Sequence, residues 1–197
     1  MYTEQAFSIP KLQGISAKTI EEHIKLYAGY VKHANLIVEH MEELMKDPEK
    51  HAYELGELQR RFSFEWGGMR NHECYFKLLE GKTDPNPESA LYKAIEQKWG
   101  SIDAWKEKFT TLSLTRGIGW AMLYWDRSGK ELVHGWIDEQ HLGVLTGGIP
   151  VIALDMWEHS YVADYFPSGK KQYINDFLSQ MNWKQAEENF VDAKSIA

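Results

Sequence analysis

One short stretch, Gly81-Lys82-Thr83-Asp84-Pro85-Asn86-Pro87, most constrains what this chain can fold into. Its prolines and its glycine interrupt regular structure, because the helical conformation is disfavoured for a residue that precedes proline. Upstream of it, apolar residues recur at helical spacing over residues 17–46 and again over residues 53–79. We therefore predict an N-terminal helical hairpin domain of residues 1–84, followed by a C-terminal domain of residues 85–197 that mixes helices and strands.

The residue pattern changes after this linker. Short apolar runs replace the long helical periodicity, and the turn Asp126-Arg127-Ser128-Gly129-Lys130 joins two of them as a hairpin. The predicted elements of this part are helices at residues 88–99 and 101–114, strands at 120–125, 131–137 and 149–154, and helices at 175–181 and 183–191. The predicted fold class is α+β: an N-terminal α-helical hairpin followed by a three-stranded antiparallel sheet flanked by helices.

Charge and cysteine content exclude several classes of function. The formal net charge is -7, which argues against nucleic acid or an anionic membrane as a general partner. Cys74 is the only cysteine, so no intrachain disulfide can form and a reducing compartment is expected. The first residues show no secretory signal, and no apolar run reaches the roughly 20 residues that cross a bilayer. We expect a soluble, cytoplasmic protein.

An acidic residue and a histidine follow the third predicted strand, in the stretch Asp155-Met156-Trp157-Glu158-His159. At the end of a rigid strand Asp155 and His159 can converge on one point, and carboxylate with imidazole is a common ligand pair for transition metals. Two ligands do not complete a site. His23 and His72 lie on the aromatic, inward faces of the two long predicted helices, where an unpaired imidazole would be costly to bury. Each histidine alone also fits an ordinary core or surface residue.

Together these four residues supply three imidazoles and one carboxylate, with room for a solvent molecule. Such a donor set suits iron or manganese, which change oxidation state by one electron. Zinc fits the same ligands but has no redox chemistry. The remaining histidines are expected to be exposed or structural: His33, His40, His51, His134 and His141.

Five short motifs follow one another along the chain. They are Ile15-Ser16-Ala17-Lys18-Thr19-Ile20-Glu21-Glu22-His23, Gly67-Gly68-Met69-Arg70-Asn71-His72, Gly117-Ile118-Gly119-Trp120, Asp155-Met156-Trp157-Glu158-His159 and Asn182-Trp183. In this order and spacing they resemble the iron/manganese superoxide dismutase family over nearly the whole chain. The resemblance implies that His23, His72, Asp155 and His159 bind one iron or manganese ion per chain, and that Trp120 is a wall of the metal cavity.

The resemblance also implies a function. Members of the family oxidise one superoxide to O2 and reduce a second to H2O2, with uptake of two protons. A Gln amide that hydrogen-bonds to the metal-bound solvent tunes the reduction potential. Gln140 stands where manganese-type members carry this Gln, and Gly68 stands where many iron-type members carry it. Gln140 is therefore the candidate donor, and manganese is favoured over iron.

The chain departs from the family at the entrance to the site. The family carries a gateway His and a gateway Tyr after its first ligand. Here Tyr27 follows His23 by four residues, and Val31, beside Tyr30, holds the ungapped position of the gateway Tyr. We expect Tyr27 or Tyr30 to restore the solvent network, and the sequence leaves both alternatives open.

The resemblance predicts a homodimer. In the family, the residue that Glu158 matches reaches across a two-fold axis to the last His ligand of the partner subunit. We therefore expect Glu158, with Trp157 beside it, to contribute to the dimer contact and to the surroundings of the ligands. A second cross-subunit contact is lost here, because Val162 stands where the family has a Tyr.

Superoxide dismutase is the expected function, with superoxide as substrate. The altered gateway supports an alternative, a metal-binding protein of the same fold with little dismutase activity. Iron oxygenases also combine His and carboxylate ligands with an open position, but no signature of an organic-substrate pocket is visible here. The activity of metal-loaded protein towards superoxide separates these three hypotheses.

Overall fold

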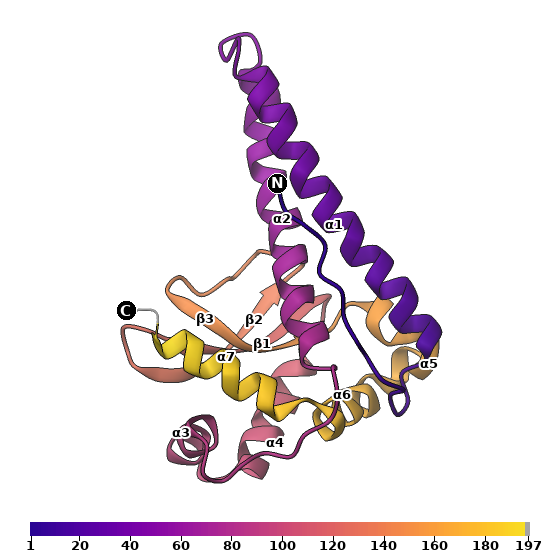
Figure 1. The fold of residues 1–197 in the computed structure, drawn as a ribbon, viewed down its shortest axis with the longest axis vertical. Coiled ribbons are helices and arrows are strands. Elements are labelled where there is room, and N and C mark those ends of the chain that lie inside the picture. Colours follow the sequence, from indigo (N-terminus) through magenta and orange to yellow (C-terminus); the bar gives the residue numbers. More distant parts are fainter. Residues whose placement is uncertain (196–197) are drawn as a thin grey trace.

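The structure is a computed structural model and describes residues 1–195 (Figure 1). Its N-terminal part is a hairpin of two long helices, α1 (Ala17–Leu44) and α2 (Ala52–Lys77), which projects well beyond the rest of the chain. Helix α1 begins where the side chain of Ser16 accepts a hydrogen bond from the backbone N–H of Thr19. The predicted helical hairpin is confirmed. Among the described residues, neither these helices nor any other combines the length and apolar character needed to span a membrane.

The C-terminal part surrounds a sheet with helices, which confirms the α+β class. Its helices and strands are α3 (Ala90–Trp99), α4 (Ile102–Ser113), β1 (Gly119–Asp126), β2 (Glu131–Asp138), β3 (Gly148–Asp155), α5 (Val162–Tyr165), α6 (Lys170–Gln180) and α7 (Trp183–Ser195). Two short 3-10 helices, η1 (Glu158–Ser160) and η2 (Pro167–Gly169), lie between β3 and α6.

The antiparallel strands lie in the order β2-β1-β3, so β1 is central. All of β1 except its last residue is buried, which explains its unbroken apolar and aromatic sequence. The pairing of β1 with β3 places Trp120 opposite Asp155. The sheet thus brings side by side two residues that belong to separate sequence motifs.

The segment before α1 runs along the helical hairpin (Figure 1). The side chain of Asn35 in α1 makes two hydrogen bonds to the backbone of Tyr2. The Tyr2 N–H donates to Asn35 Oδ1 over 2.7 Å, and Asn35 Nδ2 donates to the Tyr2 carbonyl over 2.8 Å. Phe7 packs against Tyr27 and Phe76, with ring centroids 5.4 Å and 5.0 Å away. This segment therefore adds an aromatic layer to the core of the hairpin.

Both closing helices are longer than predicted, since α7 runs to Ser195, four residues past its predicted end at residue 191. Helix α6 begins at Lys170, five residues before the predicted start at residue 175. The polar segment at residues 167–171 shows no apolar periodicity, but Tyr173 and Ile174 are fully buried in the fold. Packing of these two side chains, rather than local pattern, stabilises the first turn of the helix.

Candidate metal centre

Four side chains from distant parts of the chain converge in the core. His23 lies on α1, His72 on α2, Asp155 ends β3 and His159 lies in η1. One ligand atom of each lies within 4.8 Å of the others, and among the described residues this is the one such group that could hold a metal ion. Asp155 Oδ2 is 3.1 Å from His23 Nε2 and 3.1 Å from His159 Nε2. It is 3.5 Å from His72 Nε2.

His72 carries its proton on Nδ1 and directs an unprotonated Nε2 towards this cluster. Its Nδ1 lies 2.6 Å from the carbonyl oxygen of Gly68, one helical turn earlier. Because a carbonyl only accepts, Nδ1 carries the proton and Nε2 presents a lone pair. That Nε2 is buried and has no hydrogen-bond partner among the described residues. A metal ion would use this lone pair, so the residues fit the cofactor that the sequence implies.

The cluster combines an ionised carboxylate, Asp155, with two imidazoles, His23 and His72, whose pKa values burial lowers. Burial by itself would raise the pKa of Asp155, but the charges and hydrogen bonds of His159 and His23 hold the pKa of this carboxyl well below its usual range. Burial lowers the pKa of His23, and burial together with His23 lowers the pKa of His72 to about 3. An ionised carboxylate beside the neutral imidazoles of His23 and His72 suits metal binding, and a bound cation would compensate the buried charge.

Gln140 is fully buried between two aromatic residues. Trp120 Nε1 donates to Gln140 Oε1 over 2.8 Å, and Gln140 Nε2 donates to the Tyr30 hydroxyl over 2.9 Å. An indole N–H can only donate, so it determines which end of the amide faces Trp120. The rings of Trp120 and Tyr30 pack against His72, with centroids 5.0 Å and 5.1 Å away. The three residues form one hydrogen-bonded wall beside the cluster.

The two gateway candidates, Tyr30 and Tyr27, have different hydrogen-bond partners. Tyr30 bonds to Gln140, and burial raises the pKa of its hydroxyl. The Tyr27 hydroxyl instead accepts from the backbone N–H of Gln5 over 2.9 Å and donates to Glu73 over 3.2 Å. Burial raises the pKa of Tyr27 to about 12. In the part of the chain that the structure describes, it is the hydroxyl of Tyr30 that is joined to Gln140.

Trp157 and Glu158 lie between two cluster residues and have different surroundings. The Trp157 backbone N–H donates to Asp155 Oδ1 over 2.8 Å, and its ring stacks on His159 with a centroid distance of 5.7 Å. Its indole N–H donates over 3.0 Å to the carbonyl oxygen of Glu139, in the loop after β2. Glu158 is exposed, beside a His159 side chain that keeps 22% of its surface accessible.

Known proteins match the chain over most of its length. Residues 87–189 match the family described as iron/manganese superoxide dismutases, C-terminal domain. A "Superoxide dismutase [Fe]" from Cupriavidus metallidurans is 35% identical over 188 residues, which cover 93% of this chain and 92% of that protein. The chain belongs to the iron/manganese superoxide dismutase family.

Relatives of both metal types are present in this superoxide dismutase family. A "Superoxide dismutase [Mn]" from Mycolicibacterium smegmatis is 32% identical over 174 residues, which cover 88% of this chain and 83% of that protein. A "Superoxide dismutase [Mn], mitochondrial" from Glossina morsitans morsitans is 30% identical over 186 residues, which cover 92% of this chain and 84% of that protein. Their names therefore leave the choice between iron and manganese open.

Two adjacent glycines in α2, Gly67 and Gly68, let other parts of the chain pack closely against the helix. A Cβ on Gly67 would collide with the carbonyl oxygen of Gln140, and a Cβ on Gly68 would lie 2.5 Å from the ring of Tyr30. The Gln140 loop and the Tyr30 ring occupy the space that side chains would fill. In this superoxide dismutase, position 68 has no room for a Gln while Tyr30 stays in place.

Residues at the base of the site were missed by sequence reasoning. Tyr173 of α6 donates to the Asp155 carbonyl oxygen over 2.9 Å, and Ser160 donates to the same oxygen over 3.1 Å. The hydroxyl of Tyr75 lies 3.1 Å from that of Tyr173. These bonds hold the backbone that carries Asp155. Tyr173 lies in the turn of α6 that was not predicted, so its helical spacing to Phe177 was the signal that could have found it.

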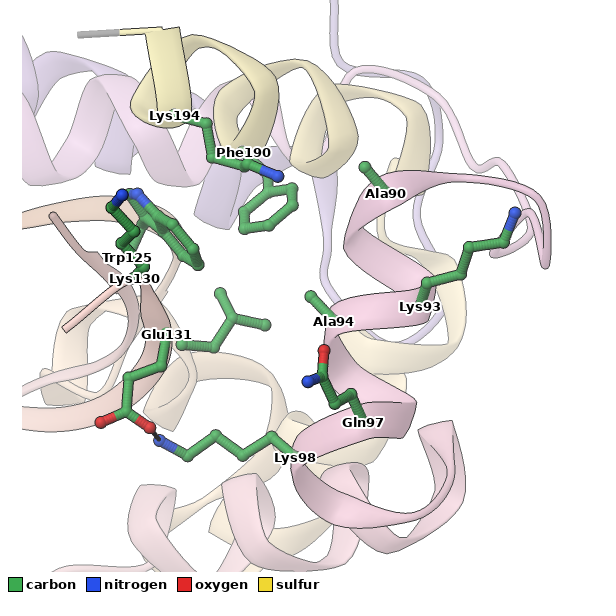
Figure 2. Close-up of a pocket in the computed structure, with 11 residues that line it drawn as sticks. Ala90, Lys93, Ala94, Gln97, Lys98, Trp125, Lys130, Glu131, Phe190 and Lys194 are labelled. Carbon is green, nitrogen blue, oxygen red and sulfur yellow. Dashed lines mark hydrogen bonds and ion pairs between the residues drawn. The ribbon is translucent and has the colours of Figure 1, made fainter. Parts of the chain in front are cut away.

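A surface hollow of about 530 Å³ lies between α3, α7 and the β1–β2 hairpin and includes none of these residues (Figure 2). Trp125, Leu132 and Phe190 contribute its apolar lining. Lys98 and Glu131 form an ion pair of 2.7 Å at its rim and neutralise each other. We assign this hollow no part in the chemistry of the site.

Proposed function

We propose that this protein is a superoxide dismutase that binds one iron or manganese ion through His23, His72, Asp155 and His159. The observation that carries the proposal is the convergence of a buried, ionised carboxylate with three imidazoles in a chain of this family. When bound, an iron or manganese ion supplies one-electron chemistry that oxidises one superoxide to O2 and reduces another to H2O2. Because the four side chains would contribute a single negative charge, a site loaded with a divalent or trivalent ion would stay positive and would attract the superoxide anion.

Gln140 is the residue we propose to tune the site. Its Oε1 is held by Trp120 and one N–H is given to Tyr30, so the amide keeps a second N–H for solvent at the site. Since both ends of the amide are held, this donor does not need to reorganise when the charge of the site changes. Trp120 orients the amide and closes the wall beside His72.

Tyr30 is the gateway tyrosine in this proposal, although it precedes the usual position by one residue. Its hydroxyl accepts from Gln140 and retains its own proton, because burial raises its pKa. That proton is available for donation to solvent at the entrance. The proton of the Tyr27 hydroxyl is given to Glu73, so we assign Tyr27 to packing and to anchoring the N-terminal segment.

We further propose a homodimer in which Glu158 bonds to His159 of the partner subunit. The support is local: Glu158 is exposed, and the neighbouring His159 keeps an accessible edge. A bond of this kind would fix the tautomer of the ligand and raise its basicity. A two-fold axis would create two such bonds from one residue pair.

Manganese and a cytoplasmic location complete the proposal. Manganese is favoured because the tuning amide comes from Gln140 in the loop and no side chain fits at Gly68 beside Tyr30. A reducing compartment suits a chain with a single cysteine, Cys74, which can form no intrachain disulfide.

Superoxide removal by metal-loaded protein tests the proposed function. Protein stripped with a chelator is reconstituted separately with iron and with manganese, the metal content per chain is measured, and superoxide decay is followed by stopped flow. We expect the stripped protein to be inactive and the manganese-loaded protein to accelerate the decay well beyond the free ion. One ion per chain without acceleration would support the alternative, a metal-binding protein whose altered gateway has lost dismutase activity.

A further inference from the structure

The loop that carries Gln140 is held in an unfavourable backbone conformation. Glu139 has a φ of 53°, in the left-handed region that disfavours residues with a Cβ. Two side chains bond to carbonyl oxygens at this point. Asn71 Nδ2 donates to the Gln140 oxygen over 3.1 Å, and Trp157 Nε1 donates to the Glu139 oxygen over 3.0 Å. These bonds oppose relaxation of the loop, so the position of Gln140 depends on them.

Asn71 precedes the cluster residue His72 on the same helix. Its side chain is buried, with 8% of the residue exposed. Gly67 lies one turn earlier on the same face of α2, where a Cβ would collide with the Gln140 carbonyl oxygen. The loop therefore rests directly on α2, in the gap that Gly67 leaves, and is bonded there by Asn71. Helix α2 thus presents a cluster residue and also sets the distance between that residue and Gln140.

We propose that Asn71 is a positioning residue: by holding the Gln140 carbonyl, it determines where the Gln140 amide lies relative to the ligand cluster. The effect on a bound metal rests on the proposed function, but the positioning itself is a property of the metal-free chain. An Asn that only stabilised the loop would lower stability when removed and leave the bond between Trp120 and Gln140 unchanged. The two accounts therefore differ in the state of that bond.

The test observes this bond in metal-free protein through the indole N–H resonance of Trp120, assigned with Trp120→Phe. Asn71→Ala removes the donor and places a better helix former in α2. We expect the Trp120 indole proton to move upfield and to exchange with solvent about tenfold faster, the factor for a hydrogen bond of about 1.4 kcal/mol. Asn189→Ala is the matched control, because Asn189 Nδ2 makes the same kind of bond, 3.0 Å long, to the carbonyl oxygen of Val151 in β3. The control should lose stability and keep the Trp120 resonance unchanged.

A second variant and a second readout keep the proposal open to refutation. Gly67→Ala pushes the Gln140 loop away from α2 without removing a hydrogen-bond donor. It tests the positioning of Gln140 even if Asn71→Ala does not fold. Both variants should move the Trp120 resonance and should shift the midpoint potential of iron-loaded protein in the direction that Gln140→Leu shifts it, at unchanged metal content. An unmoved Trp120 resonance in a folded variant would overturn the positioning role, whatever the activity. If the native metal-loaded protein lacks dismutase activity, the proposed function fails, and a moved resonance in the variants would still support the positioning role.

Discussion

Replacing Gln140 with Leu removes a side chain that makes two hydrogen bonds beside the ligand cluster. Leu is close to Gln in size but has no polar atoms, so the change abolishes the 2.8 Å bond from Trp120 and the 2.9 Å bond to Tyr30. The indole N–H of Trp120, which is fully buried, is left without its acceptor. None of the four cluster residues is altered, so we expect the metal ion to remain bound.

The expected loss of stability follows from these contacts. A buried donor left unpaired costs roughly 1–3 kcal/mol, and the lost bond to Tyr30 contributes about 0.5–1.5 kcal/mol. Burial of the apolar Leu side chain offsets part of this, by about 1–2 kcal/mol. We therefore expect the free energy of unfolding of metal-free protein to fall by about 2 kcal/mol. For a chain of this size that corresponds to a decrease in Tm of about 4–8 °C.

Denaturant unfolding of metal-free protein, redox titration of iron-loaded protein and superoxide decay together check this prediction. Gln140→Leu should lower stability, shift the midpoint potential and reduce activity at full metal content. Gln180→Leu is the matched control, because Gln180 is also buried and bonds through both ends of its amide, to the N–H of Gln13 at 2.8 Å and to its carbonyl at 3.0 Å. It should lose similar stability and keep the potential of the native protein. Native stability and potential in Gln140→Leu would refute the role that we assign to Gln140.

Three further outcomes are expected. His72→Ala protein that remains folded should hold well under one metal ion per chain by elemental analysis, because one lone pair of the donor set is lost, and full metal content would exclude the ligand assignment. Glu158→Ala should shift the protein towards monomer in sedimentation at micromolar concentration and weaken metal retention, and native protein that sediments as a fully loaded, active monomer would refute the dimer. Burial lowers the pKa of His134 from 6.5 to about 4, so the unfolded chain binds a proton that the folded chain does not, and stability falls as pH drops from 6.5 towards 4. In His134→Phe this fall in stability should be smaller by about 2 kcal/mol, which is less than the whole pKa shift would give because the His134 ring is partly exposed. Equal pH dependence of the unfolding free energy in both proteins would contradict the prediction.

The architecture could be predicted from the sequence because it depends on residues that are near one another in the chain. Apolar residues at helical spacing were sufficient to predict α1. Apolar runs bounded by turn residues were sufficient for the strands. The start of α6 was predicted wrongly, because residues 167–171 are polar and the first turn is stabilised by burial of Tyr173 and Ile174 in the fold.

The four residues of the cluster could also be named from the sequence. Each stands in a short motif, and a strand end or a helix face restricts where its side chain can point. The structure brings these side chains together around Asp155 Oδ2. Gly67 and Gly68 carried a further signal, since glycine inside a helix indicates close packing, but they did not reveal what packs there.

Only the tertiary structure decided which partners the surrounding side chains take. Tyr27 and Tyr30 share the buried face of α1, yet Tyr30 bonds to Gln140, 110 residues away, and Tyr27 bonds to Glu73, 46 residues away. Asn71 likewise reaches the Gln140 carbonyl across 69 residues. Each such bond contributes about 1 kcal/mol and forms only where distance, angle and burial are all satisfied. Those conditions arise when helices and loops pack, and no pattern of neighbouring residues encodes them.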